Sequence, residues 1–330
     1  MSEALLNALA EAVAELAAER DPGAGPGLAG AARPLDGLSP ADRRTLDRLL
    51  RDAALRQSPG PRRERLLKAP ARLGLPGDAH AARCALLAAY TESFVTLVRG
   101  ADLAAPVPSC PGWTLADLVR HHGTGHRWTE HLVRTRAGAR VRPEDVPSEL
   151  PEDPADYPDW FAEGAGAALR TLGAADPDAP MWSYGADPHV RFHPRRLLFE
   201  AVVHLADAEL ALGRVPAPAD PDTAADGVEE FLENLPYYAW VAEPVARLGR
   251  DGARLRLTAT DTGAAWTVTL GGGGFAWRRG AEGEPTAAVA GTAADLLLLV
   301  HGRYAADDTT RFTATGDRTL LAAWAAATAL

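Results

Sequence analysis

Residues 199 to 207 read FEAVVHLAD and predict a helix, because nothing in the stretch breaks a helix and Pro194 lies just upstream, where helices often begin. Glu200 and His204 are four residues apart, so on a helix they lie one turn apart on the same face. Apolar side chains flank this face and indicate that it points inward: Leu197, Val203 and Ala208. A buried carboxylate and imidazole either satisfy each other and nearby polar groups or hold a metal ion.

The composition is that of a soluble globular protein with a core, since 47% of the 330 residues are hydrophobic and 24% are charged. This length suggests about two domains of roughly 150 residues each. The net charge of -10 argues against a nucleic-acid partner. Only two cysteines, Cys84 and Cys110, are present, which fits a reducing cytoplasm. We expect neither a secretory signal nor a membrane span, because Glu3, Glu11 and Glu15 interrupt the first apolar run and no stretch approaches the length of a span.

Helical periodicity dominates up to about residue 240. Helices are expected at 5–21, 39–55, 81–100, 114–133, 160–172 and 194–213, with a further helical piece in 223–240. Stretches rich in Pro, Gly and acidic residues separate them, at 137–156 and 174–193 among others. The helices after residue 80 suggest an antiparallel bundle. The first 75 or so residues form an appendage with a basic, proline-broken segment, which we interpret as solvated surface.

The pattern changes to period two near Asp251 and predicts strands in ARLRLTATD, AWTVTLG and the segment after GGGG at 271–274. We interpret this glycine run as a hairpin turn and not a phosphate loop, because it lacks the Lys-Ser/Thr end and does not open a helix. TAAVAG and RFTATGD add strands, and each is followed by an apolar helix. The C-terminal part is therefore expected to be a small α+β domain, with helices on one face of the sheet.

A metal site needs more ligands than Glu200 and His204. The helix expected at 114–133 offers four histidines: His121, His122, His126 and His131. A catalytic zinc usually has three protein ligands and an open position, and in a bundle they come from facing helices. On a helical wheel His122 lies near the middle of the apolar face and His121 at its edge. Spacing alone therefore favours His122, with His126 one turn later as a further candidate.

Two stretches of the sequence resemble the signatures of a known family. The stretch SCPGWTLADLVRHHGTGHRW at 109–128 resembles the N-terminal signature of the mycothiol-dependent maleylpyruvate isomerase family, a branch of the DinB-like metalloproteins. FEAVVHLADAELALG at 199–213 is similar to the family's second signature, E-x-x-x-H followed by Asp. TAADLLLLVHGR at 292–303 and the run GDRTLL at 316–321 resemble its sterol-carrier-like C-terminal domain. The resemblance covers about residue 81 to the C-terminus.

The resemblance implies an α+β multidomain fold. A helical N-terminal extension (1–78) would precede a DinB-like antiparallel four-helix bundle (79–246) and a sterol-carrier-like α+β domain (247–330). The implied metal ligands are His121, Glu200 and His204, with a divalent metal, zinc first, and mycothiol or a similar thiol as co-substrate.

Two further residues are implied in the site. Arg303 matches a family arginine that points toward the active site and could hold a carboxylate, as a substrate or thiol anchor. Asp207 either orients a ligand imidazole or faces solvent. His122 stands where the family usually has Leu, so the choice between His121 and His122 stays open. Leu205 and Ala206 replace the family's Arg and aromatic residue, which puts the usual substrate in question.

The resemblance implies a metal-dependent isomerase or S-transferase, in which a metal-bound thiolate attacks an electrophilic small molecule. One alternative is a thiol-independent metalloenzyme of specialised metabolism on the same scaffold. Another is a non-catalytic protein that binds a small ligand. Outside the candidate site, we interpret Cys110 as structural because it has no basic neighbour in sequence, and Trp113 as a core residue. His189 and His193 lie in a loop, where histidines are usually solvated.

Overall fold

The structure is a computed structural model that describes residues 46, 49–50 and 79–328. The chain divides into two compact units, residues 1–93 and 94–330. All candidate site residues belong to the second unit.

Most expectations for the N-terminal extension lie outside the described residues. They include the helix at 5–21, the linker after it and the basic segment that begins at Ser58. Of the helix expected at 39–55, the structure describes Leu46, Leu49 and Leu50, which are helical.

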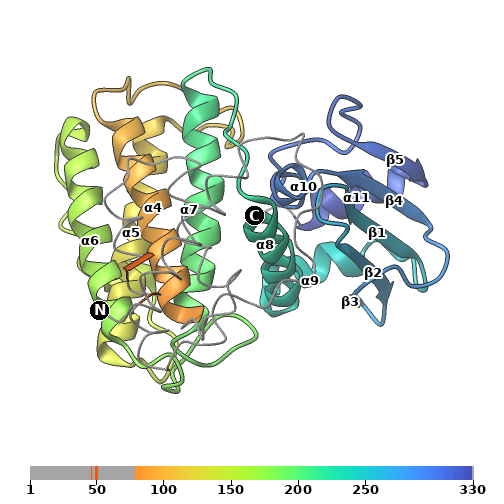
Figure 1. Ribbon diagram of the computed structural model, residues 1–330, viewed down its shortest axis with the longest axis horizontal. Helices are drawn as coiled ribbons and strands as arrows, with labels where there is room; N and C mark the ends of the chain where they lie inside the picture. The colour runs from red at the N-terminus through yellow and green to blue at the C-terminus, as the bar shows by residue number, and fades with distance from the viewer. Residues whose placement is uncertain (1–45, 47–48, 51–78, 329–330) are drawn as a thin grey trace, which may run out of the picture. The chain divides into compact units, whose positions relative to one another are not determined.

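Helices make up most of residues 79–246, as the periodicity predicts (Figure 1). They are α4 (Ala79–Val98), α5 (Leu115–Thr135), α6 (Tyr157–Ala174), α7 (Phe192–Ala211), α8 (Pro221–Asn234) and α9 (Ala239–Ala246), with three short 3₁₀ turns, η1 (Pro143–Asp145), η2 (Pro154–Asp156) and η3 (Leu235–Tyr237). The helical piece expected in 223–240 is interrupted after α8, where Pro236 lies in η3, because proline cannot donate the next backbone hydrogen bond.

Helix α5 begins with a complete capping box. The Thr114 hydroxyl accepts a hydrogen bond from the backbone N–H of Asp117, and the Asp117 carboxylate accepts one from the backbone N–H of Thr114 at 3.0 Å. Helix α5 packs against α6 and α7 (Figure 1). A Cβ at Gly123 of α5 would lie 2.3 Å from the Trp160 ring of α6, so only glycine allows this close approach. Apolar residues of these helices share one core, among them Leu115, Leu118, Phe161, Ala165 and Ala208.

The C-terminal part contains a five-stranded mixed sheet in the order β3-β2-β1-β4-β5. The strands are β1 (Arg254–Ala259), β2 (Ala265–Gly271), β3 (Gly274–Arg279), β4 (Ala287–Gly291) and β5 (Thr313–Gly316). Only the β1–β4 pair is parallel. Gly272 and Gly273 form the β2–β3 turn with φ of 61° and 78°, which confirms the hairpin prediction.

Two helices complete the sheet region: α10 (Ala293–Val300) after β4 and α11 (Arg318–Thr328) after β5. Helix α10 packs against α8 as well as against β1 and β4. Residues alternate between buried and partly exposed along β1, as expected for a sheet covered on one face. The expected α+β architecture is confirmed, while the count of four helices in the bundle and the domain boundaries stay predictions.

The sequence predicts no stretch that approaches the length of a membrane span, and one described helix does not fit that expectation. Helix α4 has 20 residues and is apolar enough to cross a membrane by length and composition, with 44% of its most apolar window buried. This is weak evidence for a span, because the core helix of a soluble protein passes the same test.

Candidate metal centre

Helices α5 and α7 bring together the three residues that the sequence resemblance assigns to the metal. One ligand atom each of His121, Glu200 and His204 lies within 4.8 Å of the other two. His204 is buried, Glu200 is half-buried and His121 is exposed, so the cluster opens toward solvent on the His121 side. The i,i+4 spacing places Glu200 Oε2 3.0 Å from His204 Nε2 on α7.

Asp207 orients the His204 imidazole. His204 Nδ1 lies 3.0 Å from Oδ2 of Asp207, which is completely buried. The interpretation of Asp207 as a solvent-facing residue is therefore wrong. An ionised aspartate can only accept, so Nδ1 carries a proton, and in the neutral imidazole the Nε2 lone pair is then available to a metal ion at the cluster. Burial alone would lower the His204 pKa, but the neighbouring Asp207 and Glu200 carboxylates raise it above its ordinary value.

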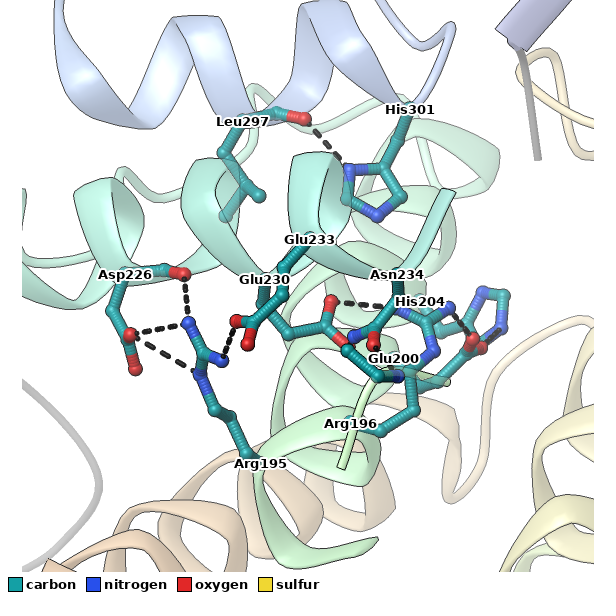
Figure 2. A network of polar contacts seen from close by, with 11 residues as sticks. Arg195, Arg196, Glu200, His204, Asp226, Glu230, Glu233, Asn234, Leu297 and His301 are labelled. Atoms are coloured by element: carbon teal, nitrogen blue, oxygen red, sulfur yellow. Dashed lines mark hydrogen bonds and ion pairs between the residues drawn. The ribbon is translucent and has the colours of Figure 1, made fainter. Parts of the chain in front are cut away.

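The carboxylate of Glu200 is held by Arg196, one turn earlier on α7 (Figure 2). Arg196 also donates to Glu230 of α8 at 3.0 Å, and Asn234 donates to the other Glu230 oxygen at 2.8 Å. Burial would raise the Glu200 pKa, but Arg196 and His204 hold it well below its ordinary value. Glu200 is therefore an anion, as a metal ligand must be.

Arg303 contacts Asp207 from the loop after α10. Its Nε and Nη2 atoms donate to the two Asp207 oxygens at 3.0 and 2.9 Å, and Nη1 donates to the backbone carbonyl of His301 at 2.6 Å. Ser109 adds a fourth hydrogen bond to Asp207 at 2.6 Å. The carboxylate that Arg303 holds in this structure is thus one of the protein's own. Its predicted role as an anchor for substrate or thiol stays a prediction.

Cys110 corrects one sequence interpretation, because it does have a basic neighbour. Its Sγ lies 3.7 Å from Arg303 Nη2 and 3.9 Å from Asp207 Oδ2. Burial and the Asp207 charge raise the Cys110 pKa despite the opposing effect of Arg303. At neutral pH this side chain is a thiol, which agrees with its interpretation as a structural residue.

His122, which spacing alone favours as a ligand, is buried beside the cluster, with its ring 5.0 Å from that of His204, but the converging ligand atoms are those of His121, Glu200 and His204. The His122 ring stacks on Phe161 at 5.0 Å between centroids and meets the edge of Phe94 at 5.1 Å. His126 is also buried, and its Nδ1 donates to the His122 carbonyl at 3.0 Å. Burial lowers the pKa of His122 well below its usual range and that of His126 to about 4, so both are neutral core residues.

The donor set fits a divalent metal ion. Two imidazoles and one carboxylate are a common ligand set of catalytic zinc, with a further position left for water or substrate. His204 Nε2 is buried and, although close to Glu200, has no aligned hydrogen bond among the described groups. A cation at this point would satisfy that lone pair. Asp207 supplies the outer carboxylate that usually orients a ligand histidine.

Two cavities meet at the cluster. The smaller, of about 590 Å³, is lined by all three cluster residues together with Cys110, His301 and Arg303. The larger, of about 850 Å³, is lined by His121 and Glu200 and by many aromatic side chains. The aromatic residues of its wall are Trp113, Trp128, Trp182, Tyr184, Tyr237, Tyr238 and Trp240. Trp113, expected in the core, is half-buried and lines both cavities.

The remaining sequence candidates lie apart from the cluster. His131 is half-buried on α5, and His189 pairs with Asp187 at 2.5 Å in the loop before α7. His193 is buried in the first turn of α7, so its interpretation as a solvated histidine is wrong.

Sequence patterns did not identify several residues that lie near the cluster. Arg196 could have been found, because it lies one helical turn before Glu200. Tyr184 lies in a loop, and Tyr238 and His301 lie at the ends of helical segments, where no periodic pattern marks them.

The fold and site define a two-part α+β protein with a two-histidine, one-carboxylate cluster on its helices. Family models match the chain in two consecutive segments. The mycothiol maleylpyruvate isomerase N-terminal domain matches residues 84–209, and the MDMPI C-terminal domain matches residues 222–323. Together they span well over half of the sequence. The chain therefore belongs to the mycothiol-dependent maleylpyruvate isomerase family, a family of enzymes, as its motifs predict.

One solved structure has the same fold. The crystal structure of the mycothiol-dependent maleylpyruvate isomerase is 16% identical, with a TM-score of 0.50 over 72% of this chain and 92% of that chain. A His-to-Ala mutant of that enzyme, also 16% identical and with the same coverage, has a TM-score of 0.48. At this identity the likeness concerns the fold alone. No curated protein matched the sequence.

Proposed function

We propose that this protein is a metal-dependent isomerase or S-transferase that uses mycothiol or a similar low-molecular-weight thiol. The observation that carries the proposal is the convergence of His121, Glu200 and His204 within 4.8 Å at the meeting point of two cavities. Family membership supports the thiol, since the family is named for its dependence on mycothiol.

A divalent metal held by these residues would lower the pKa of a bound thiol, so that thiolate forms at neutral pH. The chain's own residues prepare the site for it. Arg196 keeps Glu200 ionised, and Asp207 keeps the proton of His204 on Nδ1. The exposed position of His121 leaves one side of the cluster open to the reactants.

The chemistry is the addition of the thiolate sulfur to a carbon of an electrophilic double bond. The electron pair of that bond moves onto the conjugated carbonyl oxygen, which leaves a single bond that can rotate. Return of the pair expels the thiolate and regenerates the double bond as the other isomer. Protonation of the adduct instead retains the sulfur and gives an S-conjugate, so the same site serves isomerase and transferase reactions.

Tyr184 and Tyr238 are suited to stabilise the oxygen that becomes negative. Both line both cavities, and neither hydroxyl hydrogen-bonds another group within residues 79–328. Burial raises the pKa of both phenols above the ordinary value, so they remain protonated donors at neutral pH. Preorganised donors of this kind stabilise charge that develops in a transition state.

The test compares His204→Ala with His131→Ala, a histidine of α5 outside the cluster. Metal content is measured by mass spectrometry on protein purified without an affinity metal. We expect about one equivalent in the wild type and in His131→Ala and a loss in His204→Ala. In the cobalt-substituted protein, mycothiol should produce a thiolate-to-metal absorption band, with turnover of maleylpyruvate or another electrophile measured on the same samples.

The outcomes separate the proposal from its alternatives. Metal without a thiol band, together with activity that persists when every thiol is removed, would point to a thiol-independent metalloenzyme. Absence of metal after reconstitution would contradict both and leave a small-ligand-binding protein.

A further inference from the structure

The larger cavity beside the metal cluster has an unusually aromatic wall. The chain has eight tryptophans and six tyrosines, and four of these tryptophans and three of these tyrosines line this one cavity. They come from α5 and the turn just before it, from the loop before α7 and from the segment around η3 and α9. Aromatic residues make up only 6% of the sequence, so their concentration here is a feature of the cavity rather than of the composition.

The rings form a connected series. Trp128 meets the edge of Trp182 at 6.1 Å between centroids and lies 5.4 Å from Tyr184. Tyr184 stacks with Tyr238 at 6.1 Å, and Tyr238 stacks with Trp240 at 4.9 Å with only 3° between the planes. The series therefore runs from α5 to the start of α9, with Tyr184 and Tyr238 also facing the metal cluster.

Two members of this wall are exposed although they are large and apolar. Trp240 is 64% exposed and Tyr237 is 60% exposed. Burial of such side chains against an apolar partner is favourable, and aromatic pairs add specific stacking geometry. The cavity's volume of about 850 Å³ is in the range of pockets for drug-sized ligands. Its charged residues include Arg120 and Arg140, and Arg120 already pairs with Asp117 at 2.9 Å.

We propose that this larger cavity binds a planar aromatic substrate, with its reactive double bond at the metal cluster and its ring system between the tryptophan and tyrosine side chains. The role of this ligand as the electrophile rests on the proposed function. A small aliphatic dicarboxylate would leave the aromatic wall without a partner. The sugar rings of a thiol cofactor could also stack on tryptophan, and the wall carries polar side chains such as Asp117, Arg140 and Ser183 that could bind its hydroxyl groups. Binding of the thiol in this cavity is therefore the competing outcome that the experiment must separate from the proposal.

The experiment measures binding of two matched acids by calorimetry. trans-Cinnamate and crotonate carry the same carboxylate and double bond and differ by a phenyl in place of a methyl group. With the metal-loaded protein and no thiol, we expect cinnamate to bind at least about tenfold more tightly than crotonate. Stacking on one ring contributes roughly a two- to tenfold difference in affinity. Trp240→Ala combined with Tyr237→Ala should therefore weaken cinnamate binding at least about fivefold and leave crotonate binding unchanged.

Both substituted side chains are exposed, so these variants are expected to fold. Trp277→Ala on β3, outside the cavity, is the matched control and should bind both acids as the wild type does. Equal affinity of the wild type for the two acids would overturn the proposal. Unchanged cinnamate binding in the double variant would also overturn it. A double variant in which only the KM for mycothiol increases would overturn it too, and would assign the cavity to the thiol.

Failure of this inference is distinguishable from failure of the proposed function. Selective cinnamate binding by a protein that takes up no metal would contradict the metal-dependent function and leave the aromatic site. A metal-loaded, thiol-binding protein that does not distinguish the two acids would contradict only the aromatic site.

Discussion

His204 Nδ1 and Asp207 Oδ2 lie 3.0 Å apart, in a pair whose aspartate has no exposed surface. The pair leaves Nε2 of the histidine directed at the cluster with Glu200 and His121. Removing such an outer carboxylate typically costs ten- to a hundredfold in metal affinity.

We therefore expect Asp207→Asn to weaken metal binding by about this factor, measured by competition with a chelator. The control is Asp187→Asn, which disrupts another Asp–His pair, with His189, outside the cluster. Metal affinity should not change in the control. Equal affinity in wild type and Asp207→Asn would mean that Asp207 does not orient a ligand.

A second prediction concerns Arg196, whose guanidinium is the cation between Glu200 and the buried Glu230. Arg196→Met leaves Glu230 without its charged partner, and loss of one member of a buried ion pair costs about 3–5 kcal/mol. The free energy of unfolding, measured in urea, should fall by about this amount. Arg196→Met combined with Glu230→Gln should recover part of the loss, because the stranded charge is gone.

The neighbouring Arg195 supplies the control. It pairs with Asp226 and Glu233, whose side chains are 35% and 41% exposed while that of Glu230 is 1% exposed, so Arg195→Met should cost less than Arg196→Met. A similar loss of unfolding free energy in both arginine variants would show that burial does not make the ion pairs of Arg196 more important for stability than those of Arg195.

A third prediction concerns the Tyr238 hydroxyl as a donor to the electrophile. Tyr238→Phe should keep the metal content and melting temperature of the wild type, while kcat falls about ten- to a hundredfold, because one preorganised donor is lost. Tyr237→Phe removes a hydroxyl from the adjacent, exposed residue and should leave kcat unchanged. Unaltered kcat in Tyr238→Phe would remove this residue from the mechanism.

A fourth prediction follows from the buried neutral histidines. Burial lowers the pKa of His126 and of His193 to about 4, from the ordinary value of 6.5. Between those pH values the unfolded chain binds more protons than the folded one, so the free energy of unfolding falls as the pH drops from 6.5 to 4. Each histidine contributes at most about 3 kcal/mol to this loss.

His126→Leu removes one of these groups and should make the decline in stability shallower across that pH window. Urea unfolding at several pH values measures it. His131→Leu, on the same helix but only half-buried, is the comparison and should keep the wild-type decline. An identical decline in His126→Leu would show that His126 does not contribute to acid sensitivity.

The sequence alone determined the features that depend on neighbouring residues. The i,i+4 spacing places Glu200 and His204 on one face because helix geometry is local. The start of α5 follows from Thr114 and Asp117, and the β2–β3 hairpin follows from glycines that tolerate positive φ.

Only the tertiary structure decided which residues meet. His121 and His122 differ by one position, and their rings lie 5.1 and 5.0 Å from the His204 ring of α7. Only the packing shows that a ligand atom of His121 converges with those of Glu200 and His204, while His122 also stacks on Phe161. The contact of Arg303 with Asp207 joins residues 96 positions apart, and the aromatic cavity takes its wall from three separate segments. Such contacts depend on how whole helices pack, because periodicity specifies the buried face of each helix but not the partner that buries it.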